Sequence, residues 1–151
     1  MRSYAQGTEV PVGRSRDEIE RILERFGATE QGWLRDDEKG ITTIAFRRAR
    51  RMYKFSIHIP VLSEFMATPK QRYERTPIQA KAAQDAETRR RFRSLANYIK
   101  ALLDAVDTGI IELEEALLPY LLLGGSKTLY EEIKPQLGTG QNINLSLPPR
   151  Q

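Results

Sequence analysis

The sequence predicts an α+β fold, in which helices pack on one face of a small antiparallel sheet with three to four strands, in the order β-α-β-β-β-α-α-α. Residues 41–48 and 51–60 alternate apolar and polar side chains with a period of two, which is typical of half-buried strands. Helix-start signals, a Ser or Thr followed three residues later by Glu or Gln, occur at Ser15, Thr76 and Thr128. No helix separates the central strands, so a doubly wound nucleotide-binding fold is not expected.

The N-terminal part of the chain predicts a short edge strand followed by a helix. Residues 8–12 alternate like a strand, and the proline within them would confine that strand to a sheet edge. Ser15 and Glu18 have the spacing of a capping box, in which each side chain bonds the backbone amide of the other residue. We expect an amphipathic helix over 16–26, ended by Gly27.

The centre of the chain predicts a three-stranded meander, with strands at 28–34, 41–48 and 51–60. The first turn lies at 36–40, where Gly40 can adopt a positive φ. The second turn falls at 48–51. In this register Phe46 and Phe55 point into the core, while Lys54 shares the open face of the sheet with Ser56 and His58.

Three helices should follow a loop at 61–75. The longest should run from Thr76 to about Thr108, with its alanine-rich first half extending past the core as a solvated segment. A helix over 112–123 should bend at Pro119, and a last helix should run from Thr128 to near Pro135. We expect one domain over 1–137 and a flexible tail over 138–151.

Charge is distributed unevenly along the chain. Residues 47–100 hold fourteen Lys or Arg against four Asp or Glu, a net charge of +10, whereas the remainder holds ten against sixteen, a net charge of −6. A basic centre with acidic flanks is expected of a protein that meets a polyanion on one side. Charge blocks that only keep a small domain in solution are the alternative interpretation.

Two basic segments are the candidate binding elements, a hairpin and a stretch of the long helix. Arginine suits phosphate because its planar guanidinium donates two parallel hydrogen bonds, and four arginines replace the usual Asn-Gly or Asp-Gly at the hairpin turn. A polar stripe on a helix can follow a phosphate backbone, although any amphipathic helix has such a face. The predicted nucleic-acid-binding residues are Arg47, Arg48, Arg50, Arg51, Lys54, Arg89, Arg90, Arg93 and Lys100.

The sequence contains no convincing catalytic constellation. Without cysteine, and with His58 as its single histidine, it offers little for a zinc site or a Ser-His-Asp triad. The run Gly124 to Thr128 lacks the glycines that a phosphate-binding loop requires. We therefore predict no catalytic residue, no metal and no cofactor.

Several motifs together resemble small, uncharacterised proteins that bacteriophages and prophages encode. The residues that carry the resemblance are Tyr4-Ala5, Gly7-Thr8, Val10-Pro11-Val12, Arg14-Ser15-Arg16, Glu18-Ile19-Glu20, Phe26-Gly27-Ala28, Ile99-Lys100-Ala101, Ala105-Val106 and Gly109-Ile110. It spans most of the chain and implies a phage or mobile-element origin, but it assigns no activity and no site residue.

These observations lead to three hypotheses. The first is a non-catalytic, phage-type accessory protein that binds DNA or RNA through the basic hairpin and the basic helix face. The second is an anti-defence inhibitor that binds a host protein or complex, for which an acidic patch at Asp104, Asp107, Glu112, Glu114 and Glu115 is available. The third is a structural or assembly subunit. In each case we expect a location in the host cytoplasm, because the chain has no cysteine and is of phage type, and no membrane association, because no apolar run is long enough to span a bilayer.

Overall fold

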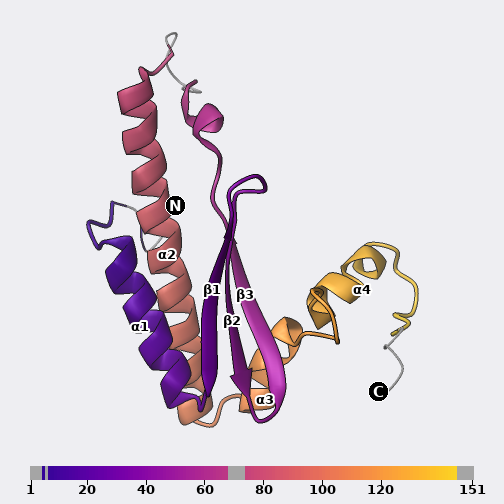
Figure 1. The fold of residues 1–151 in the computed structure, drawn as a ribbon. Helices are drawn as coiled ribbons and strands as arrows, with labels where there is room; N and C mark the ends of the chain where they lie inside the picture. The colour runs from indigo at the N-terminus through magenta and orange to yellow at the C-terminus, as the bar shows by residue number, and fades with distance from the viewer. Residues whose placement is uncertain (1–4, 6, 68–73, 146–151) are drawn as a thin grey trace.

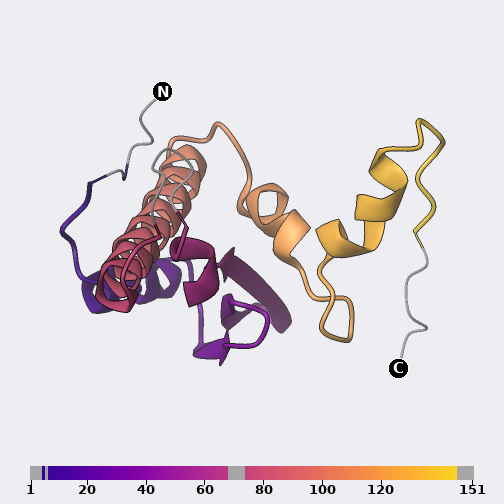
Figure 2. The same cartoon turned by 90° about the horizontal axis from the view of Figure 1, so that it is seen from above.

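Two helices that run in the same direction cover one face of a three-stranded antiparallel sheet (Figures 1 and 2). The chain is described by a computed structural model that covers residues 5, 7–67 and 74–145. The helices are α1 (Val12–Arg25) and α2 (Pro77–Asp107), and the strands are β1 (Glu30–Asp36), β2 (Ile41–Arg48) and β3 (Arg51–His58). The α+β class is therefore confirmed, with the strand order β1-β2-β3 of a meander.

Alternation along the strands separates a buried inner face from an outer face, as the sequence predicts. Phe46 of β2 lies opposite Tyr53 of β3, and its ring stacks on those of Tyr53 and Phe55 with centroids 5.4 and 5.8 Å apart. These rings join apolar residues of α1 and α2 in a single core. The prediction that Phe46 and Phe55 anchor the hairpin in the core is confirmed.

The N-terminal prediction is wrong in two respects. Residues 8–11 form no strand, and α1 begins four residues earlier than expected, at Val12. Pro11 occupies the N-cap, where its fixed φ and missing N–H cost nothing, and its carbonyl accepts a hydrogen bond from the Ser15 amide at 3.2 Å. Ser15 is therefore not a cap; it lies inside the helix, fully buried, and its hydroxyl has no hydrogen-bond partner within the described structure.

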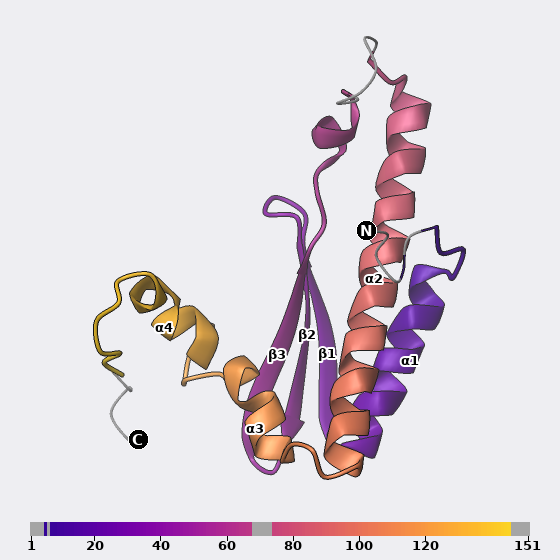
Figure 3. The same cartoon turned by 180° about the vertical axis from the view of Figure 1, so that it is seen from behind.

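The first half of α2 is less solvated than expected. The capping box of Thr76 and Gln79 is present, and the helix extends beyond the sheet alongside the segment that contains the 3-10 turn η1 (Leu62–Phe65) (Figure 3). Ala80 is fully buried, and Gln84 donates from Nε2 to the carbonyl of Pro60 at 3.3 Å. This side of the helix belongs to the packed structure because the chain returns from β3 along it.

The chain after α2 forms an arm, residues 113–145, which we call the C-terminal arm. It comprises α3 (Leu113–Leu117), the 3-10 turn η2 (Leu118–Tyr120) and α4 (Leu129–Leu137), so the predicted helix over 112–123 breaks before Pro119 instead of bending there. The amide of Leu122 donates to the carbonyl of Met52 at 2.9 Å, which adds a short fourth chain segment beside β3. Beyond it α4 projects away from the sheet (Figures 1 and 3).

Part of the predicted tail contacts α4 in the described structure. Gln136 in α4 donates from Nε2 to the carbonyl of Asn144 at 2.8 Å and accepts from the Asn144 amide at 2.7 Å. Residues 139–145 therefore fold back along α4. The last six residues of the predicted tail, 146–151, lie outside the described residues.

Candidate nucleic-acid interface

The turn between β2 and β3 holds two non-glycine residues in the left-handed region of backbone space. Ala49 has a φ of 48° and Arg50 a φ of 66°, and the paired strands end at Arg48 opposite Arg51. Positive φ at both central residues is what a two-residue type I′ hairpin turn requires, and Asn-Gly or Asp-Gly normally supplies it. Such a conformation costs roughly 1–2 kcal/mol for a residue other than glycine. The backbone conformation of Arg50 is therefore unfavourable for arginine.

Arg50 and Arg51, at and beside this turn, are exposed. Among the described residues neither side chain forms an ion pair or a hydrogen bond, so their guanidinium groups remain available to a ligand. The core rings of Phe46 and Tyr53 fix the strands from which the turn projects. The turn thus presents two arginines on a rigid support.

The other three basic residues of the hairpin bind within the molecule. Arg47 pairs with Glu30 across the sheet at 3.1 Å, and both side chains are largely exposed, so the pair is weak and open to exchange with another anion. Arg48 donates from Nε to the carbonyl of Phe26 at 2.7 Å and lies 3.5 Å from Glu114, so its position is structural.

Lys54 lies on the outer face of the sheet as predicted, but this face is not open around it. Its side chain is only 19% exposed, and its Nζ lies 3.4 Å from a carboxylate oxygen of Glu131 in α4. The sequence could not show that the C-terminal arm returns past the edge of β3 to cover this lysine.

Four basic residues of the hairpin lie near its turn, and we call them the hairpin cluster: Arg47, Arg50, Arg51 and Lys54. Arg47 faces Met52 across the sheet, so Lys54 is its diagonal neighbour at about 7–8 Å. Arg51 is the first residue of β3, about 10 Å from Lys54, and alternation places its side chain on the other face of the strand. A polyanion on the outer face therefore contacts Arg47 and Lys54 directly and reaches Arg50 and Arg51 by passing the end of the hairpin.

Lys127 adds a charge near this surface that the sequence analysis missed. It precedes Thr128, which bridges to Leu122, and Leu122 in turn bonds to Met52 of β3. Two strand spacings therefore separate Thr128 from β3, about 10 Å. No local pattern marks Lys127, because only the folded arm brings it beside the hairpin.

The basic residues of α2 are mostly engaged in ion pairs within the molecule. Arg93 pairs with Glu18 of α1 at 2.6 Å and is 15% exposed, which ties the two helices together. Glu87 pairs with Arg90 at 2.5 Å and with Arg91 at 2.7 Å, and these two contacts, that with Arg90 first, lower the pKa of Glu87 from 4.5 to about 2. Of the other two predicted residues, Lys100 is exposed, whereas Arg89 is half-buried and its Nε has no partner in the described structure.

The part of α2 around Arg89 and Arg90 lies toward the end of the sheet opposite the hairpin cluster, whereas Lys100 lies further along the helix, nearer the cluster (Figure 1). Arg91 of α2 donates to the carbonyl of His58, the last residue of β3, whereas Arg51 is the first residue of that strand. Seven residues of extended chain span about 23 Å. A nucleic-acid role for Arg89, Arg90, Arg93 and Lys100 stays a prediction, and the hairpin cluster is the better-formed surface.

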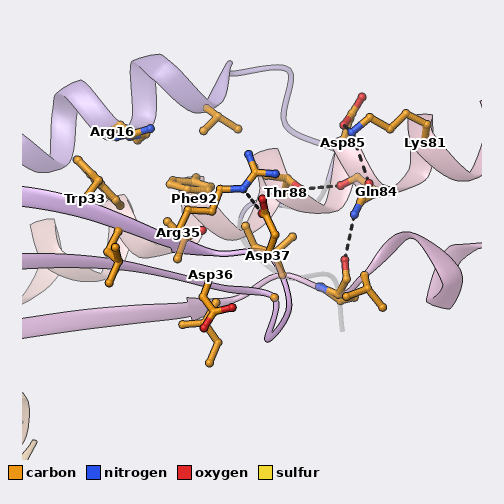
Figure 4. Close-up of a pocket in the computed structure, with 18 residues that line it drawn as sticks. Arg16, Trp33, Arg35, Asp36, Asp37, Lys81, Gln84, Asp85, Thr88 and Phe92 are labelled. Carbon is orange, nitrogen blue, oxygen red and sulfur yellow. Dashed lines mark hydrogen bonds and ion pairs between the residues drawn. The ribbon is translucent and has the colours of Figure 1, made fainter. Parts of the chain in front are cut away.

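A cleft of about 360 Å³ opens at the end of the sheet away from the hairpin turn (Figure 4). Its aromatic side is Trp33, packed at 5.7 Å from Phe92 and covered by the guanidinium of Arg16 at 4.5 Å. Two acid–base pairs lie on its rim, Arg35–Asp37 and Lys81–Asp85, the latter at 3.1 Å. The paired rim leaves little charge to attract a phosphate, and Trp33 is not free to stack on a base.

Neither a scan against protein-family models nor searches of curated proteins and solved structures found a match for the chain. The resemblance to phage-encoded proteins therefore stays a prediction. Over the described residues, no helix is long and apolar enough to cross a membrane. In the same part of the chain, no group of three or more His, Asp or Glu side chains is placed to hold a metal ion.

Proposed function

We propose that this protein binds nucleic acid, without catalysing a reaction on it, through the hairpin cluster of Arg47, Arg50, Arg51 and Lys54. The observation that carries the proposal is the turn itself. A position with φ of 66° favours glycine, yet it holds an exposed arginine, and a second exposed arginine follows it. Strained backbone of this kind is concentrated at functional sites, where a ligand rather than stability determines the residue.

Arginine is the residue best suited to phosphate in this position. Its planar group donates paired hydrogen bonds to phosphate oxygens, and it stays charged at every physiological pH. Lys54 and Arg47 extend the positive charge along the outer face of the sheet, and Arg47 can exchange its exposed ion pair with Glu30 for a phosphate. Contacts of this type bind the backbone of a polynucleotide and carry little sequence information.

Fluorescence anisotropy tests the proposal directly. Labelled single-stranded DNA, duplex DNA and RNA are titrated with the protein across a salt series. We expect the logarithm of the binding constant to fall with the logarithm of the salt concentration, with a slope of several units, because each neutralised phosphate contributes roughly one unit.

The double variant Arg50→Glu/Arg51→Glu should lose most of this binding. Arg35→Glu/Lys39→Glu, which changes the net charge by the same amount, is the matched control, because both residues are exposed at the opposite end of the same sheet. If the control lost as much nucleic-acid affinity, the loss would be an effect of net charge alone, which would contradict a local binding site. Absence of binding to all three ligands at low salt would contradict the proposed function.

A second candidate function, binding to a protein partner, is favoured by one specific observation. Helix α4 has no buried residue, and the arm exposes Leu118, Tyr130, Leu137, Ile143 and Leu145. Exposed apolar side chains gathered on one projecting element are typical of interaction surfaces. An anti-defence inhibitor or an assembly subunit of phage type would use such an arm; a phage protein with either partner would act in the cytoplasm of the host.

Pull-down from bacterial lysate with Leu137→Glu as the comparison tests this second candidate. A partner captured by the wild type and lost by the variant, combined with no nucleic-acid binding, would replace the first proposal by the second.

A further inference from the structure

A pocket of about 460 Å³ lies where the C-terminal arm passes the edge of β3. Strand β3 contributes two of its lining residues, η2 two more, and the start of the last helix the rest. They are Lys54, Ser56, Pro119, Tyr120, Thr128, Tyr130, Glu131 and Lys134. The pocket borders the hairpin cluster directly, because Lys54 belongs to both.

Two tyrosines give the pocket its aromatic walls. Tyr120 is fixed in place: its ring lies 4.3 Å from that of Phe55 in the core, and its hydroxyl bonds that of Tyr98. Burial and this hydrogen bond raise the pKa of Tyr120, so the hydroxyl stays neutral. Tyr130 is 47% exposed and forms no ring contact with another described aromatic residue, so its face is available to a ligand.

The charge of the pocket is positive on balance. Lys54 and Lys134 line it, against the single carboxylate of Glu131. That carboxylate is occupied within the fold: it accepts the amide of Thr128 at 2.9 Å to complete a capping box, and it pairs with Lys54. Lys134 is exposed and, among the described residues, has no ion-pair partner.

From this arrangement we infer that the protein binds single-stranded nucleic acid, with one base stacked on Tyr130 inside the pocket and the adjoining phosphates on the hairpin cluster. Stacking on an exposed aromatic ring beside a positively charged track is how proteins bind single strands without sequence preference. A duplex cannot fill the pocket in this way, since its bases are stacked inside the helix. The inference rests on the proposed function and adds to it the strandedness of the ligand.

The test compares a single strand with a duplex of the same sequence, each carrying one 2-aminopurine, whose fluorescence falls when the base stacks. Wild-type protein should bind the single strand more tightly and quench its 2-aminopurine. Tyr130→Ala should weaken single-strand binding about 5- to 150-fold, the range that loss of one stacked base produces, and should abolish the quenching. Duplex binding should stay unchanged in this variant.

Two further variants control the experiment. Tyr130→Phe keeps the ring and should restore both affinity and quenching. Leu137→Ala removes an equally exposed apolar side chain from the same helix and should change neither. Because α4 buries no residue, Tyr130→Ala should melt within a few degrees of the wild type.

The possible failures are distinguishable. The protein could bind the single strand and the duplex equally well, with an affinity that Tyr130→Ala leaves unchanged and Arg50→Glu/Arg51→Glu abolishes. That result overturns the stacking inference and leaves the proposed function standing. Failure of the protein to bind either ligand at low salt overturns both.

Discussion

Replacing Arg50 by glycine should stabilise the protein while weakening its binding to nucleic acid. The residue has a φ of 66°, which costs an L-residue roughly 1–2 kcal/mol and costs glycine nothing. Glycine also lowers the stability of the folded state by about 0.5–1 kcal/mol, because it raises the conformational entropy of the unfolded chain. Taken at the middle of both ranges, the net gain is about 0.75 kcal/mol, since Arg50 makes no described contact whose loss would offset it.

Differential scanning calorimetry measures the first effect, and the salt series the second. For a chain of this size the gain corresponds to a rise in Tm of about 1–4 °C. Removing one phosphate contact should lower the slope of log K against log salt by roughly one unit. The two changes run in opposite directions, as expected of a residue kept for its ligand.

Ala49→Asn separates strain from charge. Asparagine tolerates the left-handed region better than alanine, so this variant should gain stability and retain full binding. A fall in Tm for Arg50→Gly, or unchanged binding, would refute the reasoning, because the arginine would then support the fold or serve no ligand.

Three further changes test how the sheet and the helices are held. Gly40→Ala should destabilise the protein by roughly 2–4 kcal/mol, because φ is 64° and a Cβ would collide with the carbonyl oxygen of Ile59; a urea midpoint within error of the wild type would contradict this. Glu87→Gln should cost roughly 1–2 kcal/mol at neutral pH. Since folding lowers the pKa of Glu87 from 4.5 to about 2, this deficit should shrink in urea titrations as pH falls through that window, and a deficit independent of pH would exclude the ion pairs as its cause. Arg93→Ala breaks the pair with Glu18 and should lower stability by roughly 1–3 kcal/mol without changing nucleic-acid affinity, whereas an intact Tm with lost binding would return this residue to the interface.

The central strands were predictable because the alternation of apolar and polar residues within each strand indicates it directly. Ile41–Arg48 has the bounds that period-two alternation indicates, and the buried rings of Phe46 and Phe55 follow from the same pattern. The local signal at Ser15 was misleading, since a proline four residues earlier provides the actual start of α1. The start at Pro11 has no side-chain cap, so the capping-box pattern at Ser15 did not mark the beginning of this helix.

The candidate site was only half predictable. The arginines of the turn stand out in sequence, but their pairing states depend on partners far along the chain, such as Glu114 for Arg48 and Glu131 for Lys54. Tyr130 was not singled out at all, because nothing near it in sequence marks it. Its neighbours in the pocket come from β3 and η2, and only the tertiary path of the arm brings them together.

The thin attachment of α4 has a consequence for hydrogen exchange. The helix buries none of its residues, and within the described structure the arm meets β3 through one isolated bridge, between Leu121 and Tyr53, rather than a continuous ladder. Few buried contacts mean a low free energy of opening, so the amides of α4 should exchange much faster than those of β2 and β3. A ligand that spans the arm and the sheet would slow exchange in α4 more than in any strand.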